Sequence, residues 1–275
     1  MIHAASRAAL ATLRERLNGV LDSLAGGSAA CQALGGELYR VADLLASQPR
    51  LRRTLGDPST DASARSDLVR SLLSGKISDD ALTVVADAVA LRWSSPWDLT
   101  DSLEIIADDL LLAGAERDGK LDEVEDELFR FERILSSAGE LTSALDESAV
   151  SADRRRALLE SVLAGKVDPT TVQLLAQAVS SGRKRSITLA IDDLLQASAA
   201  RRERSVARVI SASELTPAQT ERLEAALSDI YARPISVRSA VDPSVRGGLV
   251  VRVGDEVIDG TVATRLAAAR AALAS

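Results

Sequence analysis

The sequence ISVRSAVDPSVRGGLVVRVGDEVIDG, residues 235–260, carries the strongest structural signal in this chain of 275 residues. Two runs rich in β-branched residues, 235–241 and 249–253, flank a turn segment rich in Pro and Gly, which is typical of strands joined by a tight connection. A third short run follows Gly254-Asp255 directly. Because Gly accepts a positive φ without steric cost, Gly-Asp between two such runs indicates a two-residue hairpin. The stretch predicts a small β element.

The same stretch closely resembles the C-terminal signature of the δ subunit of F-type ATP synthases, the family that includes the mitochondrial oligomycin-sensitivity-conferring protein. The resemblance consists of an alternating apolar run, an Asp-Pro-Ser turn, a Gly-Gly pair, and Val-Arg-Val-Gly-Asp leading into Ile-Asp-Gly. It implies structural roles and no catalytic, cofactor-binding or metal-binding role. The signature residues are Asp242, Pro243, Gly247, Gly248, Gly254, Asp255, Asp259 and Gly260.

Composition favours a mainly helical, acidic protein. Hydrophobic residues make up 46% of the chain but aromatic residues only 2%, so the core must be built from Ala, Leu, Val and Ile. Ala and Leu have the best helix propensity. The net charge of −7 argues against a nucleic-acid-binding protein, because phosphate neutralisation needs a basic surface.

Targeting signals are not evident in the sequence. The N-terminal residues lack the apolar core of a signal peptide, and no apolar run is long enough to span a membrane. The single cysteine, Cys31, excludes an intramolecular disulfide and fits a reducing compartment. We therefore expect a cytoplasmic location, no direct membrane insertion, and membrane association only through partners.

Apolar residues spaced by three and four predict a series of helices along most of the chain. We expect a strand at 205–211, a helix from Pro217 to Tyr231 capped by Thr216, and a final helix at about 260–273. On the helix from Pro217 to Tyr231, one apolar stripe is formed by Leu223, Ala226, Leu227 and Ile230. The earlier helices are expected at roughly 4–24, 29–47, 62–74, 79–92 and 97–117.

An internal repeat changes the expected architecture. Leu38-Tyr39-Arg40 recurs as Leu128-Phe129-Arg130, and the difference 128 − 38 gives an offset of 90. The same offset superimposes residues 72–77 on residues 162–167, and a later match has an offset of 84. One helical module thus occurs twice, and the helix near 97–117 serves both copies.

The expected fold class is mainly α with a small α/β C-terminal domain, built on a duplicated helical bundle that shares a central helix. We expect an additional N-terminal helical module at 1–100, a bundle of the δ-subunit type at 101–204 and an α/β domain at 205–275. Because the ordinary family plan has one bundle, the first hundred residues are an additional copy whose role the resemblance does not supply.

The sequence shows no catalytic constellation. The only histidine, His3, has no second member for acid, base or metal chemistry, and Cys31 lacks a His partner. Two Gly-Lys pairs, at Gly75 and Gly165, fail the spacing of a phosphate-binding loop and fit helix C-termini better. No cofactor is predicted.

Charged and aromatic clusters have structural interpretations that we favour over functional ones. Asp108-Asp109 and Asp192-Asp193 lack the further carboxylates of a metal site. The basic clusters are interpreted as solvated helix faces, with docking to an acidic partner as the alternative. Trp93 and Trp97 are expected in a core or turn, with an interface anchor as the alternative. The basic clusters are Arg154-Arg155-Arg156, Arg183-Lys184-Arg185, and Arg201-Arg202 with Arg204.

The resemblance implies a non-catalytic stator subunit of the peripheral stalk. In the family the bundle binds the N-terminal segment of an α subunit as an added amphipathic helix, and the C-terminal part engages subunit b. An amphipathic helix in a groove buries apolar area on both sides. We expect that groove between the helices near 102–116 and 169–181, and a second partner-binding groove in the first copy. The alternative is a free-standing helical adaptor outside the synthase.

Overall fold

The computed structural model describes residues 4–181, 186–204, 206–231, 235–242, 245, 247–253 and 256–261. It divides into two compact units, Met1–Gln196 and Ala197–Ser275. His3, the Arg183-Lys184-Arg185 cluster and the expected final helix beyond Thr261 lie outside the described residues.

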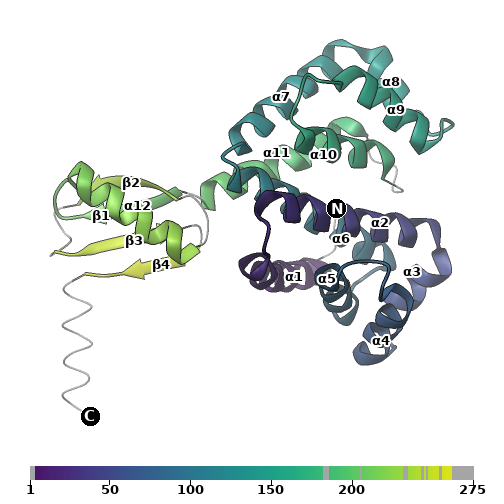
Figure 1. Ribbon diagram of the computed structural model, residues 1–275, viewed down its shortest axis with the longest axis horizontal. Coiled ribbons are helices and arrows are strands. Elements are labelled where there is room, and N and C mark those ends of the chain that lie inside the picture. The colour runs from purple at the N-terminus through teal and green to yellow at the C-terminus, as the bar shows by residue number, and fades with distance from the viewer. Residues whose placement is uncertain are drawn as a thin grey trace. The chain divides into compact units, whose positions relative to one another are not determined.

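Helices make up all the regular structure that the structure describes in the first unit (Figure 1). The predicted helices are confirmed to within a few residues at each end, and both copies of the repeat lie in this unit. Its division at residue 100 stays a prediction. The helices are α1 (Ala4–Ser23), α2 (Gly27–Ser47), α3 (Pro49–Gly56), α4 (Ala62–Leu73), α5 (Asp79–Ala90), α6 (Pro96–Arg117), α7 (Leu121–Ser137), α8 (Gly139–Asp146), α9 (Ala152–Leu163), α10 (Pro169–Ser180) and α11 (Ile187–Arg204).

The offset of 90 holds in the helix bounds themselves. Adding 90 to the bounds of α3, α4 and α5 gives those of α8, α9 and α10. Side-chain contacts repeat as well. Arg65 donates to the carbonyl of Leu55, and Arg155 donates to that of Leu145. Both turns that follow α4 and α9 contain a glycine in the left-handed region, Gly75 at φ 74° and Gly165 at φ 66°. The duplication is therefore structural.

A glutamate ties the second helix of each copy to the start of the fifth. The Glu37 carboxylate on α2 accepts from the backbone N–H of Ser78, which caps α5. Glu127 on α7 accepts from the N–H of Asp168, which caps α10, and from the Thr171 hydroxyl. A carboxylate beside a helix N-terminus is favoured by the unpaired N–H groups and the helix dipole.

Replacing Glu127 with glutamine is expected to lower the free energy of unfolding of the first unit by about 1 kcal/mol, because a buried charge-assisted acceptor is lost. Glu37→Gln is the matched control at the same place in the other copy, where the side chain is more exposed. It should cost less than half as much. Chemical denaturation of both variants measures the difference, and equal losses would contradict the role of burial.

The expectation that one helix serves both copies is confirmed by α6. It contacts α1, α2, α3 and α5 of the first copy and α7 and α10 of the second. Its residues from Asp98 to Ser102 and from Leu110 to Glu116 are buried without interruption, so neighbours cover every side of the helix there. α2 makes the most extensive contact with it. Small residues permit this close crossing, since Gly114 of α6 lies against Ser28 and Cys31 of α2.

The second unit contains a four-stranded sheet with the order β2-β1-β3-β4. Its strands are β1 (Val206–Ser211), β2 (Ser236–Val241), β3 (Leu249–Val253) and β4 (Glu256–Asp259). β1 pairs with β2 in parallel and with β3 antiparallel. The expectation that β2 and β3 are strands joined by a tight connection was therefore wrong in part: both are strands, but β1 lies between them. The hairpin from β3 to β4 is confirmed, because Val253 pairs with Glu256.

Helix α12 (Pro217–Tyr231) covers one face of this sheet (Figure 1). Its predicted cap is confirmed: Gln219 N–H donates to the Thr216 hydroxyl and the Gln219 side chain accepts from Thr216 N–H. Leu227 packs in the core, with Leu223 partly buried beside it. Ile230 was expected on the same stripe, but it is 69% exposed. The core of this unit comprises Ala207, Val209, Leu227, Ile235, Val251 and Val253.

Candidate functional site

The signature residues form the turn between β2 and β3 and its contact with the end of β4. Asp242 N–H donates to Ser211 O at 2.8 Å, which extends the pairing of β2 with β1 by one residue. Gly260 N–H donates to Leu249 O at 2.8 Å, and Asp259 accepts from Thr261 N–H. Pro243, Gly254 and Asp255 lie outside the described residues. The described members that are named here make backbone hydrogen bonds in this turn.

Gly248 explains why the signature contains a glycine pair. Its φ is +87°, and Gly247 has a φ of +80°, a region that other residues rarely adopt. A Cβ at position 248 would lie 2.4 Å from Gly260 O and 2.8 Å from the Cα of Thr261. Only a residue without a side chain allows the two backbone segments to approach this closely.

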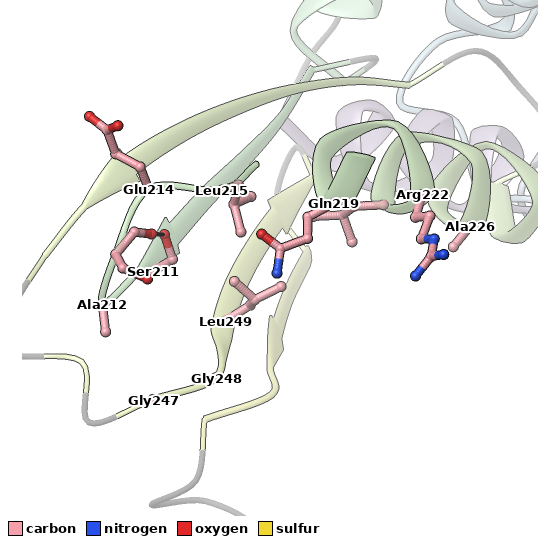
Figure 2. Close-up of a pocket in the computed structure, with 12 residues that line it drawn as sticks. Ser211, Ala212, Glu214, Leu215, Gln219, Arg222, Ala226, Gly247, Gly248 and Leu249 are labelled. Carbon is pink, nitrogen blue, oxygen red and sulfur yellow. Dashed lines mark hydrogen bonds between the residues drawn. The ribbon is translucent and has the colours of Figure 1, made fainter. Parts of the chain in front are cut away.

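The glycine pair also forms one wall of an open pocket of about 510 Å³ (Figure 2). Leu215, Leu223 and Leu249 give it an apolar floor, and Glu214 and Arg222 lie at its margin. Figure 2 shows the Leu215, Gln219 and Leu249 side chains around the opening. The pocket can accept an apolar side chain of a partner, and its lining holds no paired titratable groups that could do acid–base chemistry.

On one side of the groove expected between α6 and α10 lies α2 of the same chain, and binding of a partner helix to that groove stays a prediction. α2 packs against α6, and two of its polar side chains reach α10. Gln32 donates to the Thr170 hydroxyl, and Gln177 donates to the Asp43 carboxylate, both at 3.3 Å. Between them, Gly36 leaves room for Gln173. A helix of the same chain thus lies beside the place where we expect an external one.

The equivalent face of the first copy is formed by α1 and α5. Subtracting 90 from the α10 residues that meet α2, namely 170, 173 and 177, gives Asp80, Thr83 and Asp87 on α5. Asp80 and Thr83 are exposed, and Asp87 pairs with Arg16 of α1 at 2.7 Å. No helix among the described residues lies on this face in the way that α2 lies on α6 and α10.

Electrostatic contacts hold α2 and α1 to the acidic pair in α6. Tyr39 on α2 donates its hydroxyl to Asp108, and Arg14 on α1 pairs with Asp109 at 2.7 Å. Burial raises the pKa of Tyr39 well above its usual value, and the neighbouring Asp108 charge raises it further. Tyr39 therefore stays protonated and remains a donor. The two carboxylates are turned to different helices, which supports the structural interpretation of this pair.

The start of α10 carries a second ion pair. Lys120 Nζ donates to Asp168 Oδ2 at 2.7 Å, and Thr170 N–H donates to Asp168 Oδ1. Burial raises the pKa of Asp168, but the hydrogen bonds from Lys120 and Thr170 outweigh this effect, so the pKa is lower than usual.

Asp43 accepts a hydrogen bond from Gln177. Burial raises its pKa by more than this hydrogen bond lowers it, so the pKa of Asp43 is higher than usual.

The cysteine and the two tryptophans discussed in the sequence analysis have structural roles. Cys31 is buried. Trp93 is 3% exposed and donates to Ala88 O, while the Arg52 guanidinium lies 3.6 Å over the Trp97 ring. Both tryptophans thus pack as expected. The glutamates 37 and 127 were not predicted, although their spacing of 90 was visible in the sequence.

The described residues include neither a metal-binding cluster nor a membrane-spanning helix. No group of three or more His, Cys, Asp or Glu is placed to hold a metal ion. No helix combines the length and the hydropathy that crossing a bilayer requires. The structure offers exposed helix faces, a pocket beside α12 and a duplicated bundle. These features define a mainly helical protein with a small α/β unit.

Comparison with known proteins identifies the family. The sequence model described as "ATP synthase delta (OSCP) subunit" matches residues 110–273. "ATP synthase subunit delta" of Streptomyces griseus is 43% identical over 265 residues, which cover 96% of this chain and 97% of the relative. The Streptomyces coelicolor protein of that name is 42% identical over 100% of this chain and 99% of its own length. The Parafrankia protein of that name is 43% identical over 98% of each chain.

The chain belongs to the ATP synthase delta (OSCP) subunit family, whose members are non-catalytic subunits of that complex. The family model begins at residue 110, inside α6, whereas the three full-length relatives also cover the first copy. The additional N-terminal copy is therefore a property that these relatives share.

Proposed function

We propose that this chain is a stator subunit of the peripheral stalk. It links the catalytic head to subunit b, so that the head does not turn with the rotor and proton flow drives ATP synthesis. It lies peripherally at the cytoplasmic face of the membrane, held there by the complex. Membership of the δ family supports this role, and the arrangement of helix faces supports the contact with the head.

The head contact is proposed on the α1–α5 face of the first copy. The observation that carries this proposal is the place of α2 on α6 and α10, which provides an internal example of a helix bound to a bundle face. The partner is the N-terminal segment of an α subunit, bound as an amphipathic helix. In this proposal the bound segment lies against α1 and α5 in the same way that α2 lies beside α6 and α10.

The chemistry of the α5 face indicates which helix would fit. Asp80 and Thr83 are exposed on this face, whereas Asp87 already pairs with Arg16 of α1. The α10 residue equivalent to Thr83 is Gln173, which lies beside Gly36 of α2. A bound helix should therefore bring a small residue against Thr83 and a basic residue against Asp80.

Subunit b is assigned to the second unit. There the pocket beside α12 has an apolar floor that can receive a side chain from the C-terminal end of b. A few buried anchors contribute most of the affinity in such interfaces. The two contacts then fall on different units, as a linking subunit requires.

Thr83→Arg tests the head contact. A long charged side chain should prevent close approach of a helix and weaken binding of the catalytic head by about tenfold or more. Thr54→Arg is the matched control, because Thr54 is also an exposed helical threonine of the first copy. Binding of the purified head to the immobilised chain is measured by biolayer interferometry. Equal affinities for the two variants would contradict the α1–α5 assignment.

The free-standing adaptor remains the second candidate, since a duplicated bundle suits scaffolding in general. It predicts that neither the head nor subunit b binds the wild-type chain. The same measurement with each partner separately distinguishes the two functions.

A further inference from the structure

The face of the C-terminal sheet opposite α12 carries a row of three arginines. Arg238 on β2, Arg208 on β1 and Arg252 on β3 are direct neighbours in the register. All three are exposed, whereas Ala207, Val209, Val251 and Val253 on either side of them point into the core. Alternation along each strand therefore places the three guanidinium groups on one open face. We call it the arginine face.

Like charges lie next to each other in this row. Side chains directly opposite on neighbouring strands have Cβ atoms about 4.5–5.5 Å apart, and like charges at that spacing are destabilising. None of the three arginines forms an ion pair with a residue that the structure describes. The chain as a whole has a net charge of −7, so this positive row is a local exception.

Apolar side chains accompany the charges on the same face. Ile210 follows Arg208 by two positions and is 38% exposed, and Val257, which is opposite Arg252 on β4, is 49% exposed. Val250, opposite Ile210, is partly exposed. Exposed apolar groups beside a row of charge are typical of an interaction surface rather than of a solvated face.

The residues after Thr261 do not complement this charge. Residues 262–275 contain Arg265 and Arg270 and no aspartate or glutamate. A segment of that composition would add positive charge to the row. The charges therefore favour an acidic occupant other than residues 262–275.

We propose that the arginine face binds a protein segment that presents a row of carboxylates with apolar residues between them. The guanidinium groups pair with the carboxylates, and Ile210, Val250 and Val257 contact the apolar residues. This surface is on the opposite side of the sheet from the pocket beside α12. The inference does not depend on the stator role, because it rests on charge and register alone.

The test uses the full chain and a fluorescein-labelled decaglutamate peptide as the probe, with binding measured by fluorescence anisotropy. Wild type should bind with an affinity that falls as salt is added. The double variant Arg208→Glu with Arg252→Glu should bind about tenfold more weakly or worse. The control variant Arg92→Glu with Arg133→Glu makes the same change of net charge at exposed sites of the first unit, Arg92 in the connection between α5 and α6 and Arg133 on α7. It should stay within about twofold of wild type.

Three further results keep the proposal open to refutation. Arg208→Gln with Arg252→Gln removes the charge without adding repulsion and should also weaken binding, which covers the case in which the glutamate variant fails to fold. A chain shortened after Thr261 should bind as wild type does, and binding that arises only in the shortened chain would mean that residues 262–275 cover the face. Loss of binding in the control variant, or binding only to phosphatidylglycerol vesicles or duplex DNA, would overturn the proposal.

Discussion

Replacing Gly248 with alanine is expected to destabilise the second unit by about 3 kcal/mol or more. The positive φ alone costs about 1–2 kcal/mol for a residue with a side chain. The new Cβ would also meet Gly260 O at 2.4 Å, and both groups belong to backbone that cannot move without breaking the contact between the β2–β3 turn and the end of β4. Overpacking of this kind adds roughly 1–3 kcal/mol.

Hydrogen exchange is the appropriate measurement, because the two units need not unfold together. Amides of β1 and β3 should exchange faster in the Gly248→Ala variant, while those of α6 should be unchanged. Gly75→Ala is the matched control, since Gly75 also has a positive φ but no heavy atom within 4 Å of the new Cβ. Equal losses at the two glycines would mean that the close backbone approach contributes nothing.

Replacing Gly35 with alanine is expected to destabilise the first unit by about 2 kcal/mol. Gly35 lies where α2 crosses α6, and a Cβ there would be 2.5 Å from Leu111 Cδ1 and 3.2 Å from Ala107 O. The methyl group must push the two helices apart. This loss exceeds the gain in helix propensity that alanine ordinarily brings.

The neighbouring glycine provides the control for that crossing. At Gly36 a Cβ would meet only the Gln173 amide at 3.2 Å and the far end of Arg40. Both are ends of flexible side chains, so Gly36→Ala should be neutral or stabilise by up to about 1 kcal/mol. Thermal unfolding followed by circular dichroism compares the pair. A Gly35→Ala variant as stable as Gly36→Ala would contradict the packing of α2 on α6.

Local patterns in the sequence predicted most of the helices and strands. Each helix has apolar residues at helical spacing and a recognisable start or stop, such as Ser78 before α5 or Gly75 after α4. The offset of 90 is equally a property of the sequence, and the structure repeats it down to single hydrogen bonds. The glycine pair Gly247-Gly248 was visible in the sequence, but the backbone segment that approaches Gly248 was not.

Those local patterns did not predict the contacts between segments that are distant in the sequence. Periodicity shows that α2 has an apolar face, but it does not say whether that face meets α6 of its own chain or a partner. The glycines that permit the crossing, Gly35 and Gly114, do not by themselves predict which helix packs against them. In the same way, nothing local shows that β1 lies between β2 and β3, since strand order depends on where α12 crosses the sheet.

The position of α2 beside α6 and α10 changes how the duplication is interpreted. In the second copy α2 lies against this bundle face, whereas no helix that the structure describes lies on the equivalent α1–α5 face of the first copy. The extra N-terminal module thus supplies the helix beside one face and, in our proposal, the face that binds a partner. This difference between the two copies is the reason for proposing that the partner binds the α1–α5 face.

The most direct test of the stator role is native mass spectrometry of the chain mixed with the catalytic head and the soluble part of subunit b from its own organism. The account predicts a ternary complex that contains one copy of this chain, and binary complexes with each partner alone. Failure of the chain to bind either partner would contradict the stator role and favour the free-standing adaptor.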